Sequence, residues 1–333
     1  MKILTTYLSL QEIGQRTNQE DSIFPAIGES VPHNDLFILC DGMGGHDCGE
    51  VASQAVCQAM SSYILAHPDT EFESALEVAY EALDAKDNDS DKKMGTTLAF
   101  LKFDEGQCVV AHIGDSRIYQ IRPSEKRVVF VTHDHSLVND LIACGELTPE
   151  EAKHSTQKNV ITRAMQPHQE KRTKAEVTIL TDIQEGDYFY MCSDGMLEIS
   201  DDDDIVSVLS MNKSDEQKLY ILKGVTRDNK DNHSCHLIHV TAVEGRTAFQ
   251  QADKSERVGR SRLFYFLFAL VLVIVSGIFA SRHLKSYKKS GSVLLDSTEA
   301  TTPKHPIRQV IKSIPDEPTP PSPLDISSEK AGL

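Results

Sequence analysis

The fold is decided by the stretch LFILCDGMGGHDCGEVAS, residues 36–53. Its first five residues are apolar, which predicts a buried β-strand. Asp41-Gly42 ends that strand with an acidic turn, and glycine lets the backbone turn tightly there. Apolar residues then recur at helical spacing from Val51 to Tyr63. The sequence therefore predicts a strand, an acidic glycine-rich turn and a helix in direct succession.

Further apolar runs rich in β-branched and aromatic residues follow this stretch, and they predict more strands. These runs lie at residues 97–103, 108–113, 117–121, 127–131, 187–192 and 235–240. A second helical pattern covers residues 72–83. Two helices inserted after the first strand, with most other strands consecutive, predict an α+β domain that is largely antiparallel.

Acidic side chains follow the predicted strands at the points where the strands end. Asp41, Asp115 and Asp194 each lie beside a glycine after an apolar run, and Asp231 shortly precedes the last run. A single Asp-Gly pair is also typical of an ordinary turn. Four such acids brought to one edge would repel one another unless cations neutralise them or their pKa values rise. Carboxylate oxygens suit Mg²⁺ or Mn²⁺, so the pattern favours a metal site.

In their order along the chain, these residues resemble the metal-dependent protein phosphatase family, type 2C, in its bacterial form. The similarity runs from about Gly14 to Val240 and rests on several ordered motifs. They are Arg16-Thr-Asn-Gln-Glu20-Asp21, Asp41-Gly-Met-Gly-Gly-His46 continuing to Gly49-Glu-Val-Ala-Ser53, Gly95-Thr-Thr97, Gly114-Asp-Ser-Arg117, Thr132-His-Asp-His-Ser136, Ser193-Asp-Gly195 and Asp231-Asn232. The resemblance implies a central antiparallel β-sandwich flanked by helices on both faces.

The resemblance also implies a centre with two Mn or Mg ions. Asp41 would bridge the two ions and the Gly42 carbonyl would bind one of them. Asp194 and Asp231 would hold the other ion. By the same resemblance, Asp41 and Asp194 are predicted as catalytic residues.

Four more positions take roles from the family. Glu20 and Asp21 would act through metal-bound water. Asp115, together with Asp194, would serve a third ion. Arg16 is the remaining predicted catalytic residue, because its planar guanidinium would bind the substrate phosphate.

The chain departs from the family pattern in two places. Met43 stands where many eukaryotic members have a histidine proposed as general acid, and we do not transfer that role to His46. The general acid stays open, with a metal-bound water as one candidate. Asp228-Asn229 competes with Asp231-Asn232, and spacing to the final strand favours Asp231.

The function implied is hydrolysis of phosphoserine and phosphothreonine in proteins by a metal-bridged hydroxide, opposing a serine/threonine kinase. Two alternatives stay open: a catalytically silent phosphoprotein-binding module, and a membrane-tethered scaffold. Outside residues 254–262 and 281–333 the chain has 22 Lys and Arg against 43 Asp and Glu. Such an acidic domain disfavours nucleic-acid binding.

The C-terminal quarter has a different composition. Residues 263–280 are uncharged and, as a helix, would span about 27 Å of bilayer. They are flanked by arginines and lysines. We therefore predict a catalytic domain at 1–245, a basic juxtamembrane linker at 246–262, a transmembrane helix at 263–280 and a Pro-rich, disordered tail at 281–333. The cysteines resemble reduced core thiols, and we see no signal-peptide pattern in the N-terminal sequence. Both features favour a single-pass protein whose catalytic domain faces the cytoplasm.

Three further segments carry weaker signals. Residues 144–165 correspond to a mobile flap in similar bacterial enzymes, where substrate selection or a passive connection is expected. Residues 201–204 could form a calcium loop but more readily cap a helix beginning near Ile205. His133 and His135 are expected to make structural hydrogen bonds, and Cys40, Cys57, Cys108 and Cys192 to be reduced core thiols.

Overall fold

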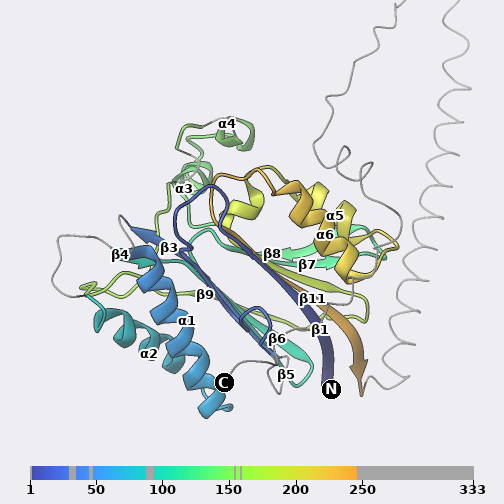
Figure 1. Cartoon of the computed structure of the whole chain (residues 1–333), viewed down its shortest axis with the longest axis horizontal. Helices are drawn as coiled ribbons and strands as arrows, with labels where there is room; N and C mark the ends of the chain where they lie inside the picture. The colour runs from blue at the N-terminus through green and yellow to red at the C-terminus, as the bar shows by residue number, and fades with distance from the viewer. Residues whose placement is uncertain are drawn as a thin grey trace, which may run out of the picture. The chain divides into compact units, whose positions relative to one another are not determined.

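The computed structural model describes residues 2–245, apart from 30–34, 45–47, 88–93, 154 and 158–159. Within this part of the chain, residues 3–242 belong to one compact unit. Two β-sheets form its centre, and the strand pairings within each are antiparallel (Figure 1). The sandwich and the antiparallel pairing agree with the sequence prediction.

The first sheet has the strand order β1-β11-β10-β7-β8. Its strands are β1 (Lys2–Glu12), β11 (His233–Glu244), β10 (Tyr188–Cys192), β7 (Arg117–Arg122) and β8 (Arg127–Val131). The second sheet has the order β2-β3-β5-β6-β9, and β4 pairs with β3. Its strands are β2 (Asp21–Phe24), β3 (Leu36–Gly44), β5 (Leu98–Asp104), β6 (Gln107–Ile113), β9 (Glu176–Leu180) and β4 (Met94–Thr96).

Helices cover the outer face of each sheet (Figure 1). Helices α1 (Cys48–Ala66) and α2 (Phe72–Asp84) pack on the second sheet. Helices α5 (Asp202–Leu209) and α6 (Asp215–Val225) pack on the first. Two short helices, α3 (Leu137–Ala143) and α4 (Pro149–Lys153), lie between β8 and β9, and a 3₁₀ turn, η1 (Asp194–Leu197), follows β10. The layers are therefore helix, sheet, sheet and helix.

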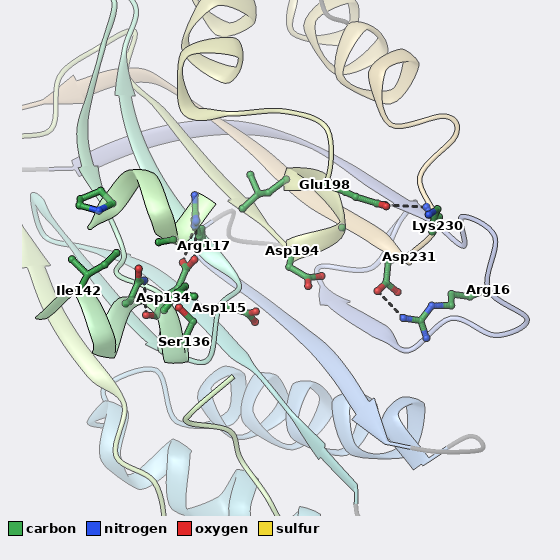
Figure 2. A pocket seen from close by; sticks show the side chains of 16 residues that line it. Arg16, Asp115, Arg117, Asp134, Ser136, Ile142, Asp194, Glu198, Lys230 and Asp231 are labelled. Carbon is green, nitrogen blue, oxygen red and sulfur yellow. Dashed lines mark hydrogen bonds and ion pairs between the residues drawn. The ribbon is translucent and has the colours of Figure 1, made fainter. Parts of the chain in front are cut away.

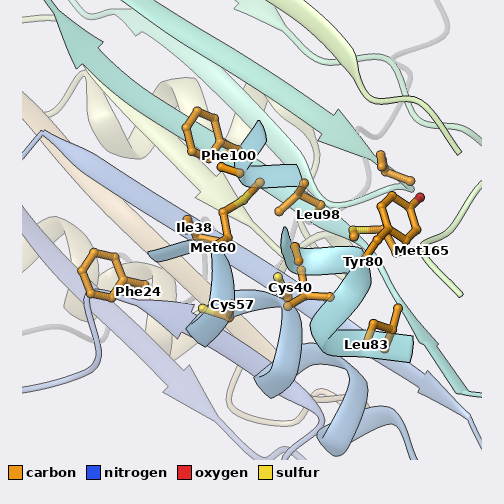
Figure 3. Close-up of a cluster of buried hydrophobic side chains, with 14 of the residues drawn as sticks. Phe24, Ile38, Cys40, Cys57, Met60, Tyr80, Leu83, Leu98, Phe100 and Met165 are labelled. Atoms are coloured by element: carbon orange, nitrogen blue, oxygen red, sulfur yellow. The ribbon is translucent and has the colours of Figure 1, made fainter. Parts of the chain in front are cut away.

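Large apolar side chains fill the spaces between these layers. Figure 3 shows the cluster under α1 and α2, where Met60 and Tyr80 meet Ile38, Leu98 and Phe100 of the sheet. Between the two sheets, rings from opposite strands pack edge to face, as the rings of Phe103 and Phe189 do at 5.1 Å. Burying each such side chain contributes about 1.5–3 kcal/mol. The scaffold that carries the strand ends is therefore firmly packed.

Several local predictions can be checked directly. All seven cysteines are free, and the four predicted as core thiols are buried. Asp201 and Asp204 form a reciprocal capping box at the start of α5, which confirms the cap. Strands β1, β2, β4 and β9 were not predicted, because β1 is mostly half-exposed, β9 is mostly exposed, and β2 and β4 are only 4 and 3 residues long.

No helix among the described residues is long and apolar enough to cross a membrane. The predicted linker, transmembrane helix and tail, at residues 246–333, lie outside the residues that the structure describes. His46 also lies outside them.

Candidate active site

The first acidic pair of the site comes from neighbouring strands. Asp21 of β2 lies directly opposite Asp41 of β3 in the strand register. The next residue, Gly42, donates its N–H to the Glu20 carbonyl at 3.0 Å. A Cβ on Gly42 would lie 2.2 Å from the Gly49 carbonyl oxygen, so only glycine lets α1 begin this close to the strand. Strand β3 continues through Asp41 and Gly42 to Gly44, so the turn predicted at this pair is not formed, and strand pairing brings Glu20, Asp21 and Asp41 together.

Two threonines fix the backbone of Asp41. The Asp41 N–H donates to Thr97 Oγ1 at 2.9 Å, and the Thr97 N–H donates to the Asp41 carbonyl at 2.9 Å. Thr96 Oγ1 donates to the same carbonyl at 3.0 Å. Thr97 Oγ1 also contacts Ser116 Oγ at 2.7 Å, which ties β3 to the residue after Asp115. The Gly-Thr-Thr and Gly-Asp-Ser-Arg motifs therefore act together to hold the acids.

Asp21 joins the two sheets. Its Oδ2 accepts hydrogen bonds from Ser193 Oγ at 3.0 Å and Ser234 Oγ at 2.6 Å, both at the first sheet. Its Oδ1 is buried and has no hydrogen-bond partner. Burial raises the pKa of Asp21, and the charges of Asp194 and Asp231 add to the rise. The two serine bonds oppose it, and the resulting pKa is about 7. The serines therefore orient a carboxylate that needs a further counter-charge.

Asn232 connects the last acidic loop to the first. Its Oδ1 accepts the Glu20 N–H at 2.8 Å, and its Nδ2 donates to the Ile13 and Asn18 carbonyls at 2.8 and 3.0 Å. A Cβ on Gly195 would lie 2.0 Å from the Asn232 carbonyl oxygen, so the Ser-Asp-Gly turn also needs its glycine. Segments from near the two ends of the described part of the chain thus meet at this asparagine.

The structure distinguishes the two competing Asp-Asn pairs. Asp228 is exposed, and Asn229 is buried with its Nδ2 donating to the Gly195 carbonyl at 2.5 Å. Asp231 instead accepts a hydrogen bond from Arg16 Nη2 at 2.7 Å and lines the same cleft as Asp194. Asp231 therefore lies at the cleft while Asn229 has a structural role, and the assignment of Asp231 as a metal ligand stays a prediction.

The electrostatics show that acids from distant parts of the chain converge. Burial raises the pKa of Asp41 well above its ordinary value, and the charges of four other aspartates add to that rise; they are Asp21, Asp194, Asp115 and Asp231. Burial and Asp231 raise the pKa of Asp194, although a hydrogen bond with Asp41 opposes the rise. Burial and the charge of Asp194 raise the pKa of Asp115 to about 7. Each carboxylate therefore destabilises the charged form of its neighbours.

This donor set fits divalent cations. The oxygens Asp21 Oδ1 and Asp115 Oδ1 are buried without a hydrogen-bond partner. Such orphaned carboxylate oxygens are costly unless something positive binds them. The cluster offers oxygen ligands only, which Mg²⁺ and Mn²⁺ prefer.

A cleft of about 470 Å³ opens beside the cluster. Figure 2 shows Asp115, Asp194 and Asp231 along it, with Arg16 at one end and Arg117 and Ile142 toward the other. Asp41 is not among the residues that line it. The side chain of Arg16 is 52% exposed there. The cleft therefore gives a substrate access to the acids.

Arg117 lines the cleft, and no role was predicted for it from the sequence. Its Nε and Nη2 donate to the two carboxylate oxygens of Asp134, both at 2.7 Å. Its Nη1 reaches Tyr119 Oη at 2.9 Å and Asp202 at 3.4 Å. This fork joins the Gly-Asp-Ser-Arg and Thr-x-Asp-His-Ser motifs beside the cleft. Sequence spacing places both residues in motifs but does not reveal that they pair.

A histidine pair lies near the site, and one of its members, His135, does not have the hydrogen bonds of a metal ligand. His112, His135 and Glu176 each place one nitrogen or oxygen within 4.8 Å of the others. Among the described residues, no three acidic side chains come this close. However, His135 Nδ1 accepts the Gly114 N–H at 3.1 Å, so its Nε2 carries the proton when the ring is neutral. Burial lowers the pKa of His135 to about 4. His112 Nε2 donates to the His133 carbonyl at 2.8 Å. The structural role predicted for His135 is consistent with this pattern.

Comparisons with known proteins give the family. The family model described as protein phosphatase 2C matches residues 12–218. The protein phosphatase PhpP of Streptococcus pneumoniae is 34% identical over 213 residues, covering 60% of this chain and 82% of that protein. The serine/threonine protein phosphatase PstP of Mycobacterium tuberculosis is 33% identical over 202 residues, covering 59% of this chain and 37% of that protein.

Solved structures agree with this. The crystal structure of the M. tuberculosis serine/threonine phosphatase PstP/Ppp has a TM-score of 0.62 and 28% identity, covering 72% of this chain and 99% of that one. The catalytic domain of PstP in complex with two manganese ions has a TM-score of 0.61 and 28% identity, covering 72% of this chain and all of that one. With its fold, its ordered motifs and its converging acids, the chain belongs to the protein phosphatase 2C family.

Proposed function

We propose that this protein removes phosphate from phosphoserine and phosphothreonine in proteins at a two-metal centre. The observation that carries the proposal is the convergence of Asp21, Asp41, Asp115, Asp194 and Asp231 beside one open cleft. Relatives named as serine/threonine protein phosphatases support the substrate class. The intact acids also disfavour a silent binding module, which has no need to keep five mutually repelling carboxylates.

The residues divide the work between metal binding and phosphate binding. Asp41 and Gly42 would hold one Mn²⁺ or Mg²⁺ ion, and Asp194 and Asp231 would hold the second with Asp41. Glu20 and Asp21 lie behind them, where Ser193 and Ser234 hold the Asp21 carboxylate in one orientation. Asp115 is available to a third ion. Divalent ions bound here would lower the pKa of water and offset charge on phosphoryl oxygens.

Arg16 is placed to bind the substrate phosphate. Its guanidinium lies in the cleft beside Asp231, at the N-terminal loop that Asn232 anchors. The charges of Asp231, Glu20 and Asp41 raise its pKa, so it stays protonated. A planar guanidinium can donate two parallel hydrogen bonds to phosphate. Arg16 would therefore orient the phosphate against the acidic cluster and stabilise charge as it develops.

The wider setting is also part of the proposal. Residues 1–245 would form the catalytic domain, held at a membrane by a single helix at 263–280 and facing the cytoplasm. The 18 uncharged residues of that segment, flanked by basic residues, support the anchor. The natural opponent would be a serine/threonine kinase acting on the same targets. The linker at 246–262 and the tail at 281–333 would connect to the anchor on its two sides.

Turnover of a phosphothreonine peptide by the full chain tests the enzymatic function. We expect hydrolysis with added Mn²⁺ or Mg²⁺ and none in chelator. Asp194→Ala should remove nearly all activity, because it deletes a ligand shared by the cluster. The matched control Asp203→Ala changes an exposed acid of α5 and should keep activity. Binding of the peptide without turnover would instead support a catalytically silent module.

A further inference from the structure

The cleft beside the acids has two chemically different ends. Arg16, Asp231 and Asp194 line one end, where the phosphate is expected. The cleft is also lined by an apolar wall from α3, α4 and η1, which consists of Val138, Ile142, Pro149, Ala152 and Leu197. Figure 2 shows Ile142 on the side of the cleft away from Arg16 and Asp231. A bound peptide can therefore reach both ends in one continuous cleft.

Backbone contacts hold this apolar wall in place. The Leu137 N–H at the start of α3 donates to the Val160 carbonyl at 2.8 Å, and Ser136 pairs with Ile161 as an isolated bridge. Asn139 Nδ2 donates to the Asp134 carbonyl at 2.9 Å. On the wall itself, Val138 is only 7% exposed. The α3 part of the wall is thus attached to the Asp134–Arg117 fork.

Charge at this end of the cleft is neutralised within the protein. Arg117 faces the cleft but donates to both carboxylate oxygens of Asp134 and also reaches Asp202. The positive charge of its guanidinium is therefore already paired with carboxylates of the same chain. An acidic or second phosphorylated side chain would gain little from it, whereas an apolar side chain would gain from burial against the wall.

We propose that the wall formed by Val138, Ile142, Pro149, Ala152 and Leu197 is a subsite for an apolar substrate side chain near the phosphorylated residue. The inference rests on the proposed phosphatase function. An extended peptide advances about 3.3 Å per residue, so a neighbour one or two positions away reaches along the cleft from the phosphate. The partner is thus a phosphoprotein segment that carries a large aliphatic residue beside its phosphoserine or phosphothreonine.

Paired peptides test this with the full chain and Mn²⁺. Each pair has phosphothreonine in a serine-rich context, with leucine or serine at one of the two positions on either side. We expect leucine at one or more positions to raise kcat/KM by about tenfold, mostly through KM, because the gain comes from burying an aliphatic side chain. Peptides with glutamate at the same positions should show no such gain.

Variants assign the preference to the wall. Ile142→Asn and Leu197→Asn should each bring the leucine-to-serine ratio of kcat/KM toward one. The matched control Ile179→Asn alters an exposed isoleucine of β9 outside the cleft and should keep the ratio. Ile142→Ala is the milder second variant if the asparagine substitution disturbs folding, which near-UV circular dichroism reports.

The outcomes separate this inference from the function beneath it. Turnover of the serine-flanked peptide by the wild type shows that phosphatase activity holds. Equal kcat/KM for leucine and serine peptides, or a ratio that survives both wall variants, would then overturn the subsite alone. No turnover of any peptide would overturn the proposed function itself.

Discussion

Asp21 and Asp41 lie directly opposite each other on the antiparallel strands β2 and β3. Like charges at such a cross-strand position destabilise a sheet. Asp21 is also buried and Asp41 is half-buried, and burial raises the pKa of both. The pair is therefore a cost to the fold that a bound cation would offset. This one relationship connects the stability of the protein to its proposed chemistry.

The stability of the metal-free protein should depend on Asp21 and on pH. The folded pKa of Asp21 is about 7, above its ordinary value of 3.8. Because the folded state binds this proton more tightly, the contribution of Asp21 to unfolding free energy falls as pH rises through that window. Asp21→Asn should therefore stabilise the metal-free protein at pH 8, on the order of 1–4 kcal/mol, and by less at pH 5, which lies lower in the same window.

Urea unfolding in chelator at both pH values measures this difference. The buried His135 and His236 have lowered pKa values, so their contribution to stability changes with pH in the opposite direction. Comparison with wild type at each pH cancels this contribution. The prediction fails if Asp21→Asn is less stable than wild type at pH 8, or if it changes the unfolding free energy equally at both pH values. Either result would show that the fold does not destabilise the charged form of Asp21.

Thr97 should matter for stability although it touches no substrate. Thr97→Val keeps the shape but removes the hydroxyl that accepts the Asp41 N–H and contacts Ser116. A buried N–H left unpaired costs about 1–3 kcal/mol, and Thr97 is fully buried. Chemical denaturation of the full chain checks this, with the exposed Thr181→Val as the matched control. The account is wrong here if both substitutions are equally mild.

Arg16 should affect catalysis and not folding. Its side chain is half-exposed, so Arg16→Ala should leave unfolding nearly unchanged. Loss of its bonds to phosphate should lower kcat/KM for a phosphopeptide by about 10²–10³-fold, and Arg16→Lys should recover only part of this. Steady-state kinetics with the exposed Arg227→Ala as control would decide it. Full activity in Arg16→Ala would remove the phosphate-binding role.

The C-terminal segment should hold the protein in a membrane. If residues 263–280 span the bilayer, the full chain should stay in the membrane fraction after an alkaline wash, because about 18 apolar residues are enough to span its core. Deletion of 263–280 should release it. A reporter that works only outside the cytoplasm, fused after Leu333, should be active. Recovery of the intact chain in the wash would contradict the anchor.

The sequence was most informative about residues whose neighbours in the chain carry the signal. Asp41, Asp115 and Asp194 could be predicted as site residues because each follows an apolar strand beside a glycine, and strand ends share an edge of the sheet. Asp231 could be preferred over Asp228 because its distance to the last strand is shorter. Local patterns of this kind also predicted the helix cap at Asp201.

Residues that act through long-range hydrogen bonds could not be assigned from the sequence. Asn232 reaches Ile13 and Asn18 across more than 200 positions, and Ser234 reaches Asp21 across a similar distance. These partners are adjacent only after the two sheets pack. The same holds for the apolar wall of the cleft, whose residues come from α3, α4 and η1. Spacing along the chain does not reveal which distant residues come into contact.

The number of Mn²⁺ ions bound per chain at equilibrium tests the central claim most directly, because it depends on the carboxylate cage alone. Titration of the metal-free full chain should show two or more ions for wild type. Asp41→Asn should weaken binding of both ions of the pair, while the exposed control Asp203→Asn should bind as wild type does. Wild-type protein that binds no Mn²⁺, or an Asp41→Asn variant that binds it unchanged, would contradict the account.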